Sequence, residues 1–124
     1  MRDKMVKVVV TISHPPFGHE YTFAGLYTAT ASLSKGYEVI VILHGDGVYT
    51  GRAGQVEPLE QINLPATENQ VEDIIELDGR VVIDEHSLEE RGISKDELIE
   101  GIEILETSEI HDIILDHGEK VVTF

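Results

Sequence analysis

The feature that most restricts the fold of this chain is an unbroken run of β-branched residues near its start. Residues 6–13 read Val-Lys-Val-Val-Val-Thr-Ile-Ser and lead directly into His14, Pro15 and Pro16. A short apolar run without polar alternation is typical of a strand covered on both faces, which in a small domain indicates a central strand of a parallel sheet. The rest of the chain is expected to pack around this strand.

Length and composition are those of one domain covering residues 1–124. Of these 124 residues 41% are hydrophobic, which suits a single core. The sequence contains no cysteine, which excludes a disulfide, a thiolate metal site and a persulfide carrier among these residues. It shows no signal-peptide pattern and no apolar run as long as a membrane span. A cytoplasmic protein without a membrane partner is therefore expected.

The formal net charge of −15 is concentrated in the second half of the chain. Residues 1–62 hold five Lys and Arg against six Asp and Glu, whereas residues 63–124 hold four against eighteen. Such an acidic surface is a poor partner for nucleic acid or an anionic membrane. Two interpretations stay open: the acidic half keeps exposed helices solvated, or it forms a docking face for a basic partner.

Strand and helix patterns alternate along the whole chain. After the first strand, strand patterns cover residues 37–43, 79–84, 101–105 and 120–124, and helix patterns cover residues 20–35, a segment from Thr67, and residues 107–117. Ser87 and Ser94, like Thr67, are followed three residues later by Glu or Gln, which predicts that short helical turns begin there. The alternation predicts an α/β fold with a mainly parallel five-stranded sheet and helices on both faces.

Two loops interrupt this alternation. Gly45, Asp46 and Gly47 follow the second strand and predict a tight turn. They lack the glycine spacing and the lysine of a phosphate-binding loop. Residues 51–66 contain two glycines and two prolines and predict a functional or interface loop.

The first helix pattern is unusual because residues 21–34 carry no charge. Its apolar residues cover more of the circumference than one core-facing stripe requires, so burial on two sides is expected. One side faces the sheet, and the other is predicted to face a second subunit, because it would otherwise leave an exposed apolar patch. The predicted interface residues are Tyr21, Phe23, Tyr27 and Thr30.

Parallel strands end at the same edge of a sheet, where open α/β sheets bind ligands. The predicted ligand-binding residues at this edge are His14, Phe17, Gly18, His19, His44, Asp46, Tyr49, Asp84 and His86. Imidazole and carboxylate groups are ligands that zinc and other divalent ions accept, and they also serve in acid–base chemistry. Their spacing matches no recognised metal signature. The identity of any metal or cofactor is therefore left open.

Several short motifs resemble those of the DsrE/DsrF family of small sulfur-relay proteins, with its TusC/DsrF branch most similar. They are Phe17-Gly18 before the uncharged helix, Gly45-Asp46-Gly47-Val48-Tyr49 after the second strand, the Ser87–Ile93 segment with its Ser-Leu-x-x-Arg-Gly pattern, and the final Val-Val-Thr-Phe. The similarity covers nearly the whole chain. It implies a three-layer α/β/α sandwich that assembles into dimers, trimers or hexamers, often with homologous subunits.

In active members of this family, a cysteine just after the third strand carries a persulfide. Counting back from Arg91 and Gly92, the resemblance places Asp84 at that position, and a carboxylate cannot hold a persulfide. Two functions are therefore expected. The first is a non-catalytic subunit or oligomeric scaffold of a sulfur-relay-like assembly. The alternative is a protein that binds a small molecule or a metal, or an enzyme, using the His/Asp edge.

Overall fold

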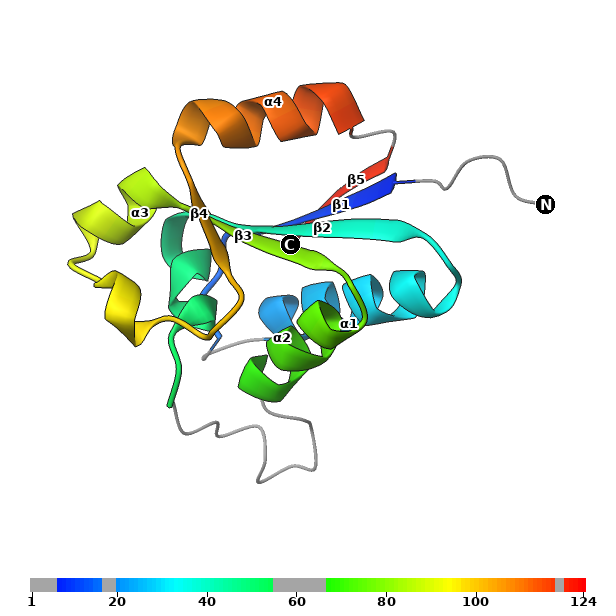
Figure 1. The fold of residues 1–124 in the computed structure, drawn as a ribbon, viewed down its shortest axis with the longest axis horizontal. Helices are drawn as coiled ribbons and strands as arrows, with labels where there is room; N and C mark the ends of the chain where they lie inside the picture. Colours follow the sequence, from blue (N-terminus) through cyan, green and yellow to red (C-terminus); the bar gives the residue numbers. More distant parts are fainter. Residues whose placement is uncertain (1–6, 17–19, 55–66, 118–119) are drawn as a thin grey trace.

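Five parallel strands form the central layer of the protein (Figure 1). The structure is a computed structural model that describes residues 7–16, 20–54, 67–117 and 120–124. Its strands are β1 (Lys7–Ile12), β2 (Glu38–Leu43), β3 (Arg80–Asp84), β4 (Glu103–Leu105) and β5 (Lys120–Thr123). They lie in the order β4-β3-β2-β1-β5, and every neighbouring pair is parallel. The predicted parallel sheet is confirmed, and β1 is paired on both sides.

Helices cover both faces of this sheet and complete a three-layer α/β/α sandwich. α1 (Tyr21–Ser34) and α2 (Thr67–Glu76) lie on one face, and α4 (Thr107–His117) lies on the other (Figure 1). Successive strands step in one direction from β1 to β4, whereas the chain then returns across the sheet to β5. Because parallel crossovers are right-handed, this reversal places α4 on the opposite face. No helix in the described ranges has the length and apolarity needed to span a membrane.

Two groups of buried side chains hold the layers together. The larger group fills the space between the sheet and α1 and α2, and it includes Val10, Leu26, Val41 and Ile74. The smaller group lies under α4 and consists of Val9, Ile40, Ile42, Val82, Ile110 and Ile113. Alternate residues of β1 and β2 thus belong to opposite cores, which explains why these strands are apolar throughout.

The uncharged helix α1 packs against α2 as well as against β1 and β2. Its buried residues are Thr22, Gly25, Leu26 and Ala29. Part of the predicted second buried side is therefore supplied by the chain itself and not by another subunit. Tyr21 and Tyr27 remain 55% and 63% exposed. The hydroxyl of Thr30 donates to the Leu26 carbonyl one turn earlier, which lets a polar side chain occupy a half-buried helical position.

The structure extends one local prediction and corrects another. The predicted tight turn at residues 45–47 is present, closed by a hydrogen bond from the Gly47 amide to the His44 carbonyl at 2.9 Å, and it continues as a 3-10 helix, η1 (Gly45–Gly51). The predicted start at Ser87 is wrong: α3 (Glu85–Glu90) begins two residues earlier, since the Asp84 carboxylate caps it. By contrast, η3 (Lys95–Glu97) begins with the predicted capping box of Ser94. Val6 and residues 55–66 lie outside the described part of the chain.

Candidate functional site

The candidate site lies where the chain connections change face. After β3 the chain contributes Leu88, Ile93 and Ile99 to the core beside α1 and α2, whereas after β4 it enters α4 on the other face. Adjacent strands whose exit segments part in this way leave a crevice beyond their carboxyl ends, where open α/β sheets bind ligands. A pocket of about 170 Å³ opens at this place.

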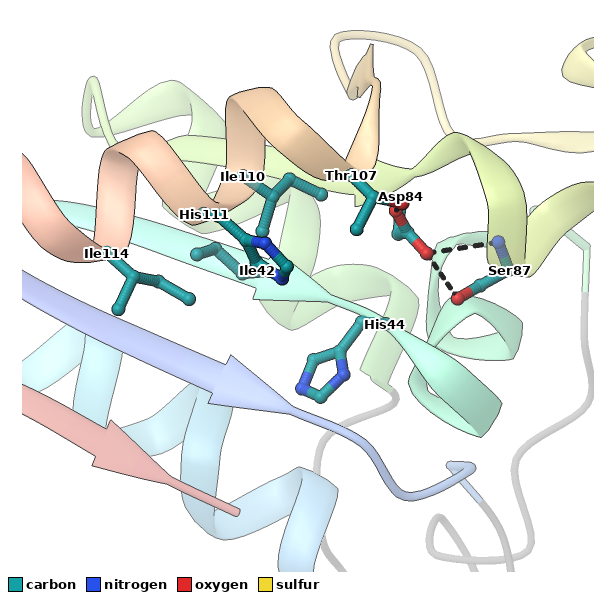
Figure 2. Close-up of a pocket in the computed structure, with 8 residues that line it drawn as sticks. All are labelled: Ile42, His44, Asp84, Ser87, Thr107, Ile110, His111 and Ile114. Carbon is teal, nitrogen blue, oxygen red and sulfur yellow. Dashed lines mark hydrogen bonds between the residues drawn. The ribbon is translucent and has the colours of Figure 1, made fainter.

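The ends of two neighbouring strands, β2 and β3, and the helices α3 and α4 build the walls of this pocket. The lining residues are Ile42, His44, Asp84, Ser87, Thr107, Ile110, His111 and Ile114 (Figure 2). His44 follows β2, Asp84 ends β3, Ser87 lies in α3, and Thr107 begins α4 just beyond β4. Figure 2 shows the imidazole of His111 reaching from α4 toward β2. Polar groups therefore gather at the strand ends, and isoleucines line the part under α4.

Asp84 is the centre of a hydrogen-bond network that joins separate elements. Its Oδ2 accepts bonds from the Ser87 amide at 3.1 Å and the Ser87 hydroxyl at 2.6 Å, and its Oδ1 accepts one from the Thr107 hydroxyl at 2.5 Å. The Ser87 Oγ in turn accepts a bond from the Gly45 amide at 3.0 Å. The carboxylate thus connects β3, the start of α3 and the start of α4, and through Ser87 it reaches η1.

The two titratable groups at the strand ends have shifted pKa values. Burial opposes ionisation of Asp84, but the hydrogen bonds from Ser87 and Thr107 outweigh burial and lower the pKa of its carboxyl group. Burial lowers the pKa of His44, and the attraction of the nearby Asp84 carboxylate opposes that shift without cancelling it. At neutral pH the pocket therefore contains a carboxylate and a neutral imidazole.

Two predicted residues at the same edge pack elsewhere. The ring of His14 lies against Tyr21, with ring centroids 4.7 Å apart. Tyr49, in η1, packs against the larger core group. The remaining predicted residues of the first loop, Phe17, Gly18 and His19, lie outside the described residues.

Two further predicted residues point away from the pocket. Asp46 forms an exposed ion pair with Arg91, with Nε and Oδ1 3.1 Å apart. His86 lies near Glu90 one turn along α3, and its side chain is 67% exposed. In the described part of the chain, the expected cluster of histidines and aspartates is therefore reduced to His44 and Asp84 at the pocket.

Three polar lining residues are not among those predicted from the sequence: Ser87, Thr107 and His111. Thr107 could have been found, because it follows a predicted strand just as His44 does. The sequence around Ser87 indicates helix capping, whereas in the structure its hydroxyl donates to Asp84. His111 occupies the second turn of a helix and has no signal that separates it from a surface residue.

The chemistry available at the pocket is hydrogen bonding around a fixed negative charge. Within residues 7–16, 20–54, 67–117 and 120–124, no three His, Asp or Glu side chains converge in a way that could hold a metal ion. The Ser87 hydroxyl donates to Asp84 and accepts from Gly45, so it serves as a structural link and is not placed as a nucleophile. The neutral imidazole of His44 offers one donor and one acceptor.

The fold and the site together define the class of protein: a parallel α/β/α domain with a small pocket beyond β2, β3 and β4. The family model for DsrE/DsrF-like proteins matches residues 6–124, and the chain belongs to this family.

Similar proteins come from archaea and from a bacterium. The chain is 33% identical to an uncharacterized protein of Methanopyrus kandleri over 119 residues, covering 94% of this chain and 93% of the relative. It is 31% identical to an uncharacterized protein of Methanocaldococcus jannaschii over 121 residues, covering 96% of this chain and all of the relative. The crystal structure of the ychN protein of E. coli superposes with a TM-score of 0.83 at 26% identity and covers 98% of this chain and 100% of that one.

Proposed function

We propose that the protein is a non-catalytic subunit or oligomeric scaffold in a sulfur-relay-type assembly and does not itself carry a persulfide. Membership of the DsrE/DsrF-like family supports the general role. The observation that carries the non-catalytic part is Asp84, which ends β3, where the family resemblance expects a cysteine. Its carboxylate is bound to Ser87 and Thr107, so this position connects α3 and α4.

Incubation with a persulfurated donor protein is expected to leave the mass of this chain unchanged. Stable sulfane sulfur is carried by thiolates, and the 124 residues contain no cysteine. Intact-mass spectrometry before and after incubation measures the outcome. A stoichiometric adduct with the mass of one sulfur atom would contradict the proposal.

The variant Asp84→Cys extends this experiment. If the position retains the surroundings of a sulfur carrier, Asp84→Cys acquires the adduct faster than Asp46→Cys, a matched Asp→Cys change at the exposed start of η1. Equal rates in the two variants would show that position 84 has no special access to the donor. Far-UV circular dichroism confirms beforehand that both variants are folded.

We also propose that the scaffold assembles through the exposed side of α1. Phe23 and Tyr27 stack there with ring centroids 6.2 Å apart, and Tyr21 is exposed on the same helix. The helix carries no charge in a chain of net charge −15, so contacts through α1 avoid the repulsion that acidic surfaces would create between copies. An apolar surface of this kind is typical of protein interfaces.

Light scattering after size-exclusion chromatography is expected to give at least a dimer at micromolar concentration. Tyr27→Glu should weaken self-association by about ten-fold or more, because it buries an unpaired charge in the interface. Leu115→Glu is the matched control, since Leu115 is 81% exposed on α4 at the opposite face of the sheet. A monomeric wild type, or dissociation by Leu115→Glu alone, would reject α1 as the interface.

The pocket favours a second candidate function, the binding of a small molecule at the His/Asp edge. It lies at the switch point of the sheet. His44 and Asp84, the two residues at the strand ends whose pKa values are shifted, both line it. This function is compatible with a scaffold role.

A further inference from the structure

The walls of the pocket at the ends of β2, β3 and β4 favour a ligand that donates hydrogen bonds. None of the described residues that line the pocket is Lys or Arg, and Asp84 contributes a carboxylate whose pKa is lowered. An anionic ligand would meet this charge without a compensating cation. The net charge of −15 of the whole chain acts in the same direction, since it attracts cations and repels anions.

The hydrogen-bond network leaves acceptors in the pocket. A carboxylate has about four acceptor sites. Ser87 fills two of them on Oδ2 of Asp84, and Thr107 fills one on Oδ1. One site on Oδ1 therefore remains. The Thr107 oxygen has donated its hydrogen and keeps its lone pairs, and the neutral imidazole of His44 has one acceptor nitrogen.

An apolar groove continues from the pocket along α4. It is lined by His111, Ile114 and Leu115, of which the first two also line the pocket. Its volume is about 280 Å³, and Leu115 is 81% exposed. A ligand that fits both parts has a compact head with several donors and a short apolar chain.

We propose that this pocket and groove bind a primary alkylammonium group. The ammonium head has three donors and one positive charge. These match the acceptors of Asp84, Thr107 and His44, while the alkyl chain lies along Ile114 and Leu115. The group can come from a free amine or from a lysine side chain. This proposal goes beyond the scaffold role and does not depend on it.

The first experiment compares three ligands of equal length by ¹H–¹⁵N NMR titration of the wild type. n-Butylammonium is expected to shift the amide signals of Ser87, Thr107 and His111 in a saturable way, with a millimolar dissociation constant. The affinity for n-butanol should be at least about ten-fold lower, because butanol lacks the charge-assisted hydrogen bonds, and butyrate should not bind. Equal affinity for butanol and butylammonium, or binding of butyrate, would overturn the proposal.

The second experiment uses a pair of matched variants. Asp84→Asn retains an acceptor at the N-cap but loses the charge, and it should weaken butylammonium binding about ten-fold or more. Asp112→Asn removes a charge from the exposed surface of α4 outside the pocket, and it should weaken binding less than about two-fold in moderate salt. Equal losses in both variants would mean that only the general acidity of the protein attracts the amine.

The length of the alkyl chain tests the groove independently of Asp84. From ethyl- to butyl- to hexylammonium, each methylene that becomes buried should tighten binding about two- to four-fold. Leu115→Ser should reduce the gain in affinity for hexylammonium and leave the affinity for ethylammonium unchanged. An affinity that does not depend on length would reject the groove.

Nα-acetyl-lysine amide distinguishes the two sources of the ammonium group. Binding as tight as that of butylammonium indicates a lysine side chain, and weaker binding indicates a free amine.

Discussion

Replacing Gly47 by alanine is expected to lower the free energy of unfolding by about 3 kcal/mol or more. A Cβ atom at this position would overlap the carbonyl oxygen of Ile12 and would lie 2.7 Å from its carbonyl carbon. These are backbone atoms at the end of β1, and the same oxygen accepts a bond from the His44 amide at 3.1 Å. Relieving the overlap would require η1 to separate from β1, which also removes Val48 from the core. Urea unfolding followed by circular dichroism measures the change.

Gly92→Ala is the matched control for the added methyl group. Gly92 has a φ of +66°, but no atom lies within 4 Å of the place that its Cβ would take, so the cost is that of backbone strain alone, about 1–2 kcal/mol. The contrast separates steric overlap from strain. A loss for Gly47→Ala no larger than that for Gly92→Ala would show that η1 can move away from β1 easily.

The sheet could be predicted from the sequence because its strands are short apolar runs separated by helical patterns. Val8, Val9 and Val10 follow one another without a polar residue, and this pattern is compatible with burial on both faces. The form of η1 could not be predicted in this way. Gly45, Asp46 and Gly47 suit a tight turn equally well, and the 3-10 helix depends on how closely Gly47 approaches Ile12 in space.

The candidate site was only partly predictable for a related physical reason. Open parallel sheets bind ligands beyond the carboxyl ends of their strands, and this rule locates the strand ends. It does not give the direction of a side chain beyond them. His86 comes two residues after the end of β3, almost as close as His44 is to β2, yet it lies on α3 and points to solvent near Glu90. Thr107 and His111 reach the pocket because the return crossover places α4 over the ends of β2 and β3, and the strand order that causes this cannot be read from local patterns.

Asp84→Ala is expected to lower the free energy of unfolding by about 2–4 kcal/mol, the sum of a lost helix cap and two hydroxyls without their acceptor. The substitution leaves the Ser87 amide and the hydroxyls of Ser87 and Thr107 without the oxygens they bind, and Asp84 itself is only 6% exposed. Urea unfolding of the variant measures the loss. A change below about 1 kcal/mol would mean that water replaces these bonds without cost, and that the network does not join α3 to α4.

The pH dependence of stability identifies the charge of Asp84 as the source of part of this effect. Its pKa is lower in the folded protein than in the unfolded chain, so the unfolded state binds a proton first as the pH falls. The stabilisation is therefore complete above the unfolded value of about 4 and is lost as the pH decreases through the lower folded value. Asp84→Asn keeps the acceptor for the Ser87 amide but cannot titrate, so the difference in stability between wild type and Asp84→Asn should shrink in this acidic range. A difference that stays constant from neutral pH to pH values below the folded pKa would assign the effect to shape and hydrogen-bond geometry instead of charge.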